Sequence, residues 1–331
     1  MPRIAARAAG LAPGLAIALL VAATATFLSE HYGAPVMLYA LLIGMALNFL
    51  TEAEKARAGI AFASSGLLRI GVALLGLRIG WQQVTALGWA PLLLVAGLVA
   101  ATLLVSIAVA RAMGFCSVFG FLSGGATAIC GASAAMALSA ALPAHPNKER
   151  ATLFAVVGVS TLSTVAMILY PLAARLAGLG DHEAGIFIGA TIHDVAQVTG
   201  AGYAISTEAG DTAIVVKLLR VAMLLPTVIA AGILGRRSPG ASGARPPLLP
   251  WFAIAFAVLV AANSLLPLPE MAVEGGGLLS RWCLVTAIAA IGIKTHLKAI
   301  VELGWRPVAL MLAETLFLAL VALAVIWLGF I

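Results

Sequence analysis

Four polar side chains lie close together in a segment that is otherwise apolar: His193, Asp194, Gln197 and Thr199. A charged side chain at bilayer depth costs at least about 2.5–3.5 kcal/mol on insertion scales, so its presence indicates a cavity and a role. We expect Asp194 and His193 to carry a coupling proton, since histidine titrates near neutral pH. Gln197 can donate amide hydrogens to an oxyanion. The alternative is that Asp194 pairs with a basic side chain and only fixes packing.

Two basic side chains fall inside the next apolar segment. Lys217 and Arg220 are three residues apart, which puts them on one face of a helix. A divalent anion in low dielectric needs about two positive partners to offset its desolvation, so we expect this pair to bind an anionic substrate. For Lys217 the alternative is snorkelling to the membrane surface. Glu314, in the last apolar segment, is expected to make an inter-helix hydrogen bond or to be balanced by Arg69.

Small residues predict breaks in the helices that carry these groups. The runs Ser123–Thr127 and Gly189–Thr191 combine glycine with small polar residues, and non-helical backbone at this depth is tolerated only inside protein or beside a water-filled cavity. A half-helix that starts at such a break points its positive end at the gap and can bind an anion. We therefore expect Thr127, Ser133 and Thr191 to contact the anion. The alternative is close packing of helices.

The elements that must position these residues are membrane helices. Of 331 residues, 63% are hydrophobic and 10% are charged, and the mean hydropathy is +1.11. A soluble domain carries roughly 25% charged residues, so a soluble enzyme is excluded. The net charge of +6 reflects basic cytoplasmic loops, and no nucleic-acid partner is expected. The chain is predicted to be an all-α polytopic membrane protein with about nine to eleven transmembrane segments.

Eleven apolar segments of roughly 20 residues, the length that crosses a bilayer, support this prediction. They cover residues 10–28, 34–50, 60–77, 90–110, 117–142, 152–178, 184–206, 212–234, 250–267, 278–293 and 307–329. With the N-terminus inside, the loops divide their Lys and Arg residues 12 to 4 in favour of the cytoplasm. The positive-inside rule then predicts a cytoplasmic N-terminus and an external C-terminus. We expect one membrane domain over 1–331.

The cysteines and histidines offer no metal or redox chemistry. Cys116, Cys130 and Cys283 are odd in number and lie in apolar runs, so neither a disulfide framework nor a zinc site is expected. The chain lacks the HExxH motif. No cofactor is expected, and an enzyme would need a nucleophile–base pair that the apolar segments do not contain.

Two stretches of the chain repeat each other. Residues 73–91 (ALLGLRIGWQQVTALGWAP) match residues 289–307 (AAIGIKTHLKAIVELGWRP), and Gly76 falls on Gly292. The matched segments are an odd number of segments apart, so they run in opposite directions. Inverted repeats are typical of secondary transporters. The repeat halves are expected at approximately 1–142 and 184–331.

A weaker match pairs residues 125–133 with residues 189–197. As plain spans these two segments would run parallel, which conflicts with an inverted repeat. The conflict disappears if both segments are re-entrant and return to the side from which they enter, leaving nine full spans. A broken helix that crosses the membrane is the alternative.

The stretches GGATAICGASAAMAL, GATIHDVAQVTGAGYA and DTAIVVKLLRV resemble the YeiH-type family of proposed sulfate exporters of the bacterial inner membrane. The resemblance covers nearly the whole chain. It implies a secondary transporter of sulfate or a related sulfur oxyanion, with the broken-helix fold of sodium–proton antiporters and bile-acid transporters. It also implies a homodimer, by analogy. The residues themselves indicate only a small anion.

The sequence therefore predicts a secondary transporter that exports a small anion by alternating access, with H⁺ or Na⁺ as coupling ion. One alternative is a cation–proton exchanger in which Asp194 binds the ion and Lys217 competes with it. Another is an anion channel, and a membrane enzyme is the last. Transport that depends on Na⁺ or Li⁺ and ignores sulfate would favour the exchanger.

Overall fold

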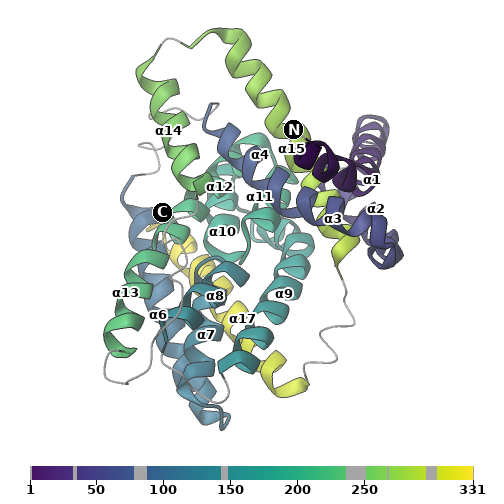
Figure 1. The fold of residues 1–331 in the computed structure, drawn as a ribbon. Coiled ribbons are helices and arrows are strands. Elements are labelled where there is room, and N and C mark those ends of the chain that lie inside the picture. The colour runs from purple at the N-terminus through teal and green to yellow at the C-terminus, as the bar shows by residue number, and fades with distance from the viewer. Residues whose placement is uncertain are drawn as a thin grey trace. The chain divides into compact units, whose positions relative to one another are not determined.

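The computed structural model describes residues 2–32, 36–77, 88–142, 148–235, 251–266, 268–295 and 304–330. Over these residues the chain forms helices and no strand (Figure 1). Each of the eleven apolar segments contributes helix, so the prediction of an all-α polytopic membrane protein is confirmed.

The chain forms two compact units. Unit 1 comprises Met1–Ala86, Thr199–Ile205 and Trp251–His296, and unit 2 comprises Leu87–Val198, Ser206–Pro250 and Leu297–Ile331. The bounds of these two units differ from those of the predicted repeat halves. Much of the repeat lies outside the described residues, at 78–87 and 296–303. The inverted repeat and its halves, 1–142 and 184–331, therefore stay predictions.

Within the described residues, seven helices are long and apolar enough to cross a membrane. They are Gly10–Tyr32, Glu54–Leu75, Ala90–Ala112, Arg150–Leu176, Thr207–Ala231, Glu270–Lys294 and Trp305–Trp327. Two shorter apolar helices, Val36–Ala46 and Ile254–Leu265, accompany them.

The helices of unit 1 are α1 (Pro2–Tyr32), α2 (Val36–Ala46), α3 (Glu54–Phe62), α4 (Leu68–Leu75), α14 (Trp251–Leu265) and α15 (Glu270–Lys294). In this unit, α2 and α4 pack on α15, whereas α3 packs mainly on α1 and α14 packs on α4. A π-helical turn, Ala63–Leu67, joins α3 to α4. Gly44 of α2 meets Gly292 of α15, where an added Cβ would lie 3.0 Å from the opposite Cα. Asn48 Nδ2 donates to the carbonyls of Ile293 at 2.7 Å and Thr295 at 3.0 Å, which satisfies the end of α15.

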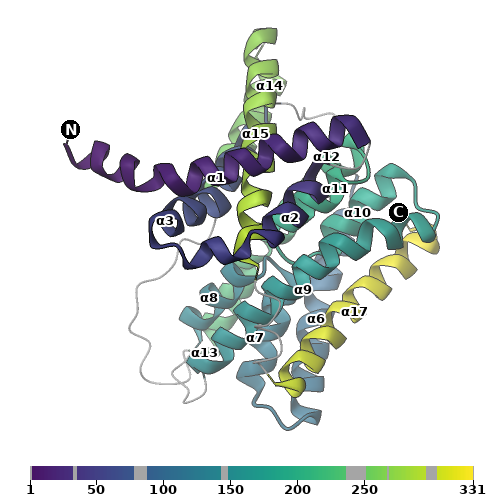
Figure 2. The same cartoon turned by 90° about the vertical axis from the view of Figure 1, so that its right-hand side faces the viewer.

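Unit 2 combines long helices with pairs of short ones. Its helices are α6 (Ala90–Ala112), α7 (Ser117–Ala128), α8 (Ala132–Ala141), α9 (Lys148–Leu176), α10 (Asp181–Thr191), α11 (Val195–Tyr203, whose last residues belong to unit 1), α12 (Thr207–Ala222), α13 (Leu224–Gly235) and α17 (Trp305–Trp327). The final helix α17 lies alongside α6 (Figure 2).

The short helices α7 and α8 form a hairpin inside unit 2. They have 12 and 10 residues, about half of what is needed to cross the hydrocarbon core. Leu122 and Leu138 pack in one cluster and Ala126 and Ala135 in another, so the two helices run antiparallel. The chain therefore enters and leaves unit 2 at the same end.

The helices α10 and α11 form a second hairpin, from the other end. An added Cβ at Gly185 would lie 2.8 Å from the Ala209 oxygen, and Gly189 packs on Ala213 and Val216 in the same order. Hence α10 and α12 run parallel. Only three residues separate α11 from the start of α12, so α11 must return to the end where α10 begins.

The helix breaks lie a few residues later than the sequence predicts. Ser123–Thr127 and Gly189–Thr191 stay helical, and the breaks fall at Ile129–Gly131 and Ile192–Asp194. The predicted positions were wrong because the small residues serve close packing: a Cβ at Gly124 would lie 2.5 Å from Ser106 Cβ. Thr127 and Thr191 consequently sit at the C-terminal ends of half-helices and not at N-terminal ends.

Candidate functional site

The tips of the two hairpins meet inside unit 2. We call Ile129–Gly131 together with Ile192–Asp194 the hairpin crossing. A Cβ added at Gly131 would lie 3.6 Å from the His193 carbonyl oxygen and 3.7 Å from Asp194 Cβ. Gly131 has φ +65° and ψ −133°, a conformation that only glycine adopts without strain.

Lys217 is bound by backbone carbonyls of both tips. Its ammonium donates to the oxygens of Ile129 at 2.7 Å, Ile192 at 2.9 Å and His193. An ammonium has three hydrogens to donate, and these three bonds use all of them. The side chain is 0% exposed, so it does not snorkel to the surface.

Arg220, one turn further along α12, binds the ends of both incoming half-helices. Its guanidinium donates to the carbonyls of Ala128 and Ile192 at 2.8 Å each, of Thr127 at 2.7 Å and of Gly189 at 3.2 Å. The last carbonyls of a helix have no intrahelical partner and form its negative end. The two cations therefore neutralise the C-terminal ends of α7 and α10.

The N-terminal ends of α8 and α11 begin at the same crossing. Ser133 is the second residue of α8 and is exposed. The backbone N–H of Asp194 donates to Ser163 Oγ at 3.1 Å. Gln197 is buried and its Nε2 donates to Thr164 Oγ1 at 3.4 Å, whereas its Oε1 has no partner among the described residues.

His193 bridges the crossing to α17. Its Nδ1 lies 3.0 Å from the Thr127 carbonyl oxygen, and its Nε2 lies 2.9 Å from Thr315 Oγ1. A carbonyl oxygen only accepts, so Nδ1 carries a hydrogen. Thr315 Oγ1 also donates to the Met311 carbonyl oxygen of its own helix at 2.8 Å, so this hydroxyl contacts both His193 and the backbone of α17.

A buried carboxyl lies beside this network. Glu314 Oε1 is contacted by the hydroxyls of Ser106 and Ser123, and Oε2 by those of Ser123 at 2.6 Å and Thr127 at 3.0 Å. The sequence marked Glu314 as an embedded acid but did not predict Ser106 and Ser123 as its partners. They are 208 and 191 residues away in the chain.

The remaining predicted residues lie apart from these contacts. The Thr191 hydroxyl donates to the Phe187 carbonyl of its own helix at 2.6 Å. Thr199 is buried on α11 in the part assigned to unit 1. The structure thus brings Thr127, His193, Lys217 and Arg220 into direct hydrogen-bonded contact with the crossing. Their roles in binding a substrate stay predictions.

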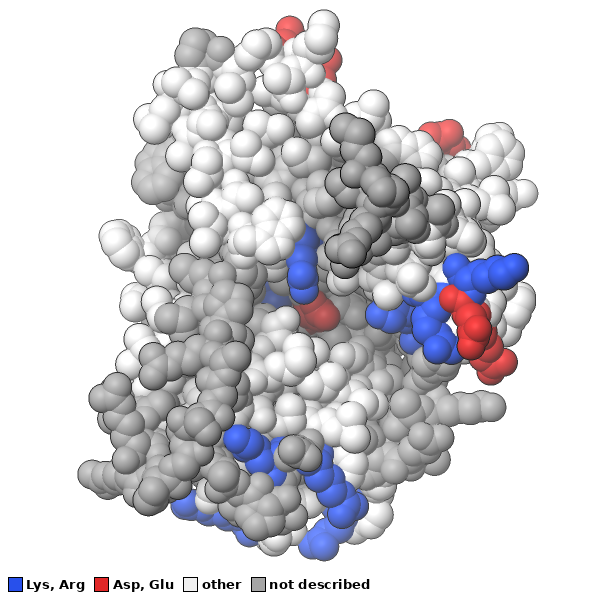
Figure 3. Space-filling model, in the orientation of Figure 1, with Lys and Arg blue, Asp and Glu red and all other residues white. Residues whose placement is uncertain are grey.

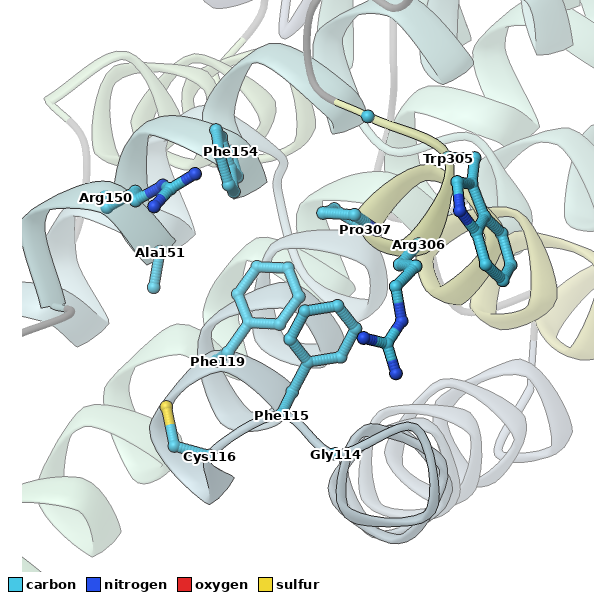
Figure 4. A pocket seen from close by; sticks show the side chains of 11 residues that line it. Gly114, Phe115, Cys116, Phe119, Arg150, Ala151, Phe154, Trp305, Arg306 and Pro307 are labelled. Carbon is cyan, nitrogen blue, oxygen red and sulfur yellow. The ribbon is translucent and has the colours of Figure 1, made fainter.

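A cavity of about 430 Å³ lies at one end of unit 2 (Figure 4). It is lined where α6 ends and where α7, α9 and α17 begin. Arg150 lies 5.1 Å from the ring centre of Phe154 and Arg306 lies 5.8 Å from that of Phe115. Cys116, at the entry to α7, and Arg150, at the start of α9, line the same cavity. The first hairpin, formed by α7 and α8, therefore begins and ends at the cavity end of unit 2.

Charged side chains of opposite sign mark the two ends of unit 2. The cavity end carries Arg111, Lys148, Arg150 and Arg306, and the other end carries Asp181, Glu183 and Glu208 with Arg175. Figure 3 also shows a cluster of charges of both signs at the right of the molecule and one positive and one negative group in a central hollow, with uncharged surface between them.

Within the described residues, no three His, Cys, Asp or Glu side chains gather where they could hold a metal ion. Cys116, Cys130 and Cys283 are free thiols.

Residues 13–311 match the family model described as conserved hypothetical protein 698. The chain is 51% identical over 321 residues to UPF0324 membrane protein CT0845 of Chlorobaculum tepidum, with 96% of this chain and 90% of that protein covered. It is 52% identical over 311 residues to UPF0324 membrane protein TauZ of Paracoccus denitrificans, with 93% and 92% covered. No solved structure matches the chain. The predicted family and the membrane location are confirmed, and these names mention no sulfate.

Proposed function

This chain belongs to the conserved hypothetical protein 698 family of membrane proteins, and from that premise we propose that it is a secondary transporter of a small oxyanion. The anion would cross by alternating access, with H⁺ or Na⁺ as coupling ion. Sulfate or a related sulfur oxyanion is the substrate we propose to test first. In this proposal the protein is a carrier and catalyses no covalent step.

The hairpin crossing is the observation that carries the proposal. Two half-helices end there and two begin, between helices long enough to span a bilayer. Backbone without helical hydrogen bonds is tolerated at membrane depth only inside protein or beside a water-filled cavity. Secondary transporters use discontinuous helices of this kind to bind substrate and coupling ion near the bilayer midplane.

The charge at the crossing favours an anion. Each helix terminus carries about half an elementary charge, so the C-terminal ends of α7 and α10 together offset about one of the two cations, Lys217 and Arg220. The Asp194 carboxylate at the same crossing can offset the other. The positive N-terminal ends of α8 and α11 supply the remaining positive potential. In this proposal the cations act through the carbonyls that they bind, and they raise the local potential without touching the anion directly.

The anion's oxygens would be bound by groups at the N-terminal ends of α8 and α11. Ser133 is exposed there, and Gln197 has an amide oxygen without a partner among the described residues. An acceptor of this kind suits a substrate that carries a donor besides its oxyanion. Taurine, which has an ammonium group and a sulfonate, is therefore included as a competitor.

We also propose an orientation and a location. Under the positive-inside rule, the end of unit 2 with Arg111, Arg150 and Arg306 is cytoplasmic. The helix α17 starts at that end, which puts the C-terminus outside. The N-terminus would be cytoplasmic, the membrane the bacterial inner membrane and the assembly a homodimer. Thiol labelling of single cysteines placed at positions 150 and 181 from either side of the membrane tests the orientation.

The transport test uses purified protein in liposomes loaded with labelled sulfate. Efflux is measured with unlabelled sulfite, taurine, chloride and acetate as competitors, under pH or Na⁺ gradients of either sign. Lys217→Ala removes three bonds at the crossing, and Ser133→Ala alters a proposed contact without touching those bonds. Lys294→Ala and Ser65→Ala, both in unit 1, are the matched controls.

We expect saturable sulfate efflux from the parent protein. The rate of efflux should fall at least tenfold in Lys217→Ala and several-fold in Ser133→Ala. The controls should transport like the parent protein. Normal transport by folded Lys217→Ala protein would show that the hairpin crossing has no role in transport. Flux of a competitor but not of sulfate would leave the carrier in place and replace its substrate.

Cation–proton exchange is the second candidate, because Asp194 lies at the crossing beside Gly131. It predicts proton movement driven by Na⁺ or Li⁺ that sulfate does not change. Asp194→Asn should abolish that movement. If sulfate stimulates the flux and Asp194→Asn retains it, the exchanger is excluded.

A further inference from the structure

We propose that Glu314 is the residue that binds and releases the coupling proton, an assignment that rests on the transport function proposed above. Its side chain is 2% exposed and lies near the middle of the 23-residue helix α17. Acidic side chains are rare inside membrane segments because burial of a charge is costly, and those of pumps and transporters form proton relays.

The hydrogen bonds around Glu314 need one hydrogen more than its neighbours supply. Ser106 Oγ lies 2.6 Å from the Gly120 carbonyl oxygen and also contacts Glu314 Oε1 closely. Two oxygens at such a separation need a hydrogen between them. A hydroxyl has one hydrogen to donate and a carbonyl has none. When Ser106 donates to Gly120, the second hydrogen must belong to the Glu314 carboxyl.

A protonated carboxyl completes the cluster. Glu314 Oε1 then donates to Ser106, while Oε2 accepts from Ser123 at 2.6 Å and from Thr127 at 3.0 Å. A carboxylate would leave two acceptors competing for the single hydrogen of Ser106. The cluster therefore accommodates one proton in the arrangement that the side chains already have.

No cation balances a Glu314 carboxylate in the part of the chain that the structure describes, where every partner of its oxygens is a hydroxyl. On the helices packed against α17 the charged and titratable groups lie toward the ends or pack elsewhere: Arg111 on α6, Lys148, Arg150, Tyr170 and Arg175 on α9, and Asp181, His182 and Glu183 on α10. Lys217, Arg220 and His193 lie at the crossing. Protonation therefore removes an otherwise unpaired buried charge.

One residue connects the carboxyl to the crossing. The Thr127 hydroxyl donates to Glu314 Oε2, while its carbonyl accepts from Arg220 at 2.7 Å and from His193 Nδ1 at 3.0 Å. Loss of the proton would change the partners of Ser106 and thereby the contacts of α7, which ends at the crossing. Proton binding and the position of the hairpin tip are coupled through these bonds.

Infrared spectroscopy of the purified protein detects the proton on Glu314 directly and needs no transport measurement. The carbonyl stretch of a protonated carboxyl differs from the bands of a carboxylate, so its loss at high pH identifies a titrating acid. The variant is Glu314→Gln, which has the shape of the protonated side chain and an N–H for Ser106. Glu208→Gln, at an exposed position in the first turn of α12, is the control.

We expect a protonated-carboxyl band in the parent protein and in Glu208→Gln, and its absence in Glu314→Gln. A band of unchanged size in Glu314→Gln would overturn the assignment. Disappearance of the band on addition of Na⁺ at constant pH would also overturn it, because the cluster would then bind a metal cation. Because no flux is measured, this result stands even if the protein transports no sulfate.

Transport then tests coupling. Glu314→Gln should lose the response of sulfate transport to an imposed pH gradient, and the control Glu208→Gln should keep it. If Glu314→Gln responds to the gradient as the parent does, or if Asp194→Asn alone loses the response, Glu314 is not the coupling residue. If the parent protein itself moves no anion, the proposed function fails and the infrared result alone decides whether Glu314 binds a proton.

Discussion

Unit 1 and unit 2 are built from the same kinds of residues but bury different ones. In unit 1 the described Lys, Arg, Asp and Glu side chains are all at least partly exposed, and its buried polar groups, such as Ser64 and Ser280, are uncharged. In unit 2 the buried side chains include Lys217, Arg220 and Glu314.

The difference follows from the backbone of each unit. The helices of unit 1 satisfy their own carbonyls, and Asn48 completes the end of α15 with two hydrogen bonds. The hairpins of unit 2 end inside the unit, at Ile129–Gly131 and Ile192–Asp194, and leave carbonyls without helical partners. The buried cations bind these carbonyls, so buried charge and broken helices occur in the same unit.

The largest loss of stability is expected when the guanidinium group of Arg220 is removed. Arg220→Ala removes the bonds to the Ala128 and Gly189 carbonyls. It leaves the carbonyls of Ile192 and Thr127 with one side-chain donor each among the described residues, Lys217 and His193 respectively. We expect the free energy of unfolding to fall by about 3–5 kcal/mol, the range for breaking a buried charged contact. Arg220→Lys should recover only part, because an ammonium cannot reproduce the planar fork. Denaturant titration in detergent measures both.

Two exposed residues are the controls for Arg220. Arg175→Ala in unit 2 and Lys294→Ala in unit 1 should each change the unfolding free energy by no more than about 0.5 kcal/mol. A loss at Lys294 as large as that at Arg220 would contradict the contrast between the units.

The second largest loss of stability is expected in unit 1, where an added methyl group would disturb close helix packing. Gly292→Ala places a Cβ 3.0 Å from Gly44 Cα and against the backbone of α2, which should cost about 1–3 kcal/mol through separation of α2 and α15. Gly275→Ala, where an added Cβ meets nothing within 4 Å, should be neutral or slightly stabilising. Thermal unfolding compares the two, and equal melting temperatures would show that the close approach is unimportant.

A smaller loss is expected at the tip of the first hairpin. Gly131→Ala has space for the methyl group but keeps φ at +65°, which costs an L-residue about 1–2 kcal/mol. Gly97→Ala, in the middle of α6 with open space around it, should instead raise stability. If both variants shift the melting temperature in the same direction, the strain at Gly131 is not the cause.

The smallest effect is expected for Asn48→Ala in unit 1. Two neutral hydrogen bonds to the end of α15 are lost, and we expect a loss of about 1 kcal/mol, the usual net contribution of such bonds. Water can replace the bond to the partly exposed Thr295, whereas Ile293 is buried. Hydrogen exchange of the last turn of α15 should accelerate while the amides around Lys217 keep their protection. Faster exchange at both places would mean that the two units unfold as one.

The sequence predicted the helices well and the breaks less well. Apolar segments identified each helix because length and hydropathy are local properties. The breaks were placed at Ser123–Thr127 and Gly189–Thr191, since glycine near polar residues fits either a break or close packing. Only the position of α6 against Gly124, a contact between distant segments, distinguishes these two uses.

The candidate site was predicted in its residues but not in its bonds. The spacing of Lys217 and Arg220 gave a shared helix face, and both do point to the crossing. Their partners are backbone carbonyls, which every residue possesses and no sequence pattern marks. The same holds for Glu314, whose hydroxyl partners Ser106 and Ser123 belong to helices made long before it.

That separation along the chain has a consequence for biosynthesis. Thr127 and Glu314 are 187 residues apart, which at about 5–20 residues per second is roughly 10–40 s of translation. During this interval the first hairpin has been made but α17, which contacts it, has not. The hairpin can already pack on α6, α9 and α13 during this interval, but the hydroxyls of Ser123 and Thr127 have no carboxyl partner until α17 is made. Deletion of α17 should therefore leave these hydroxyls unpaired and make the hairpin more accessible to the quality-control proteases of the membrane.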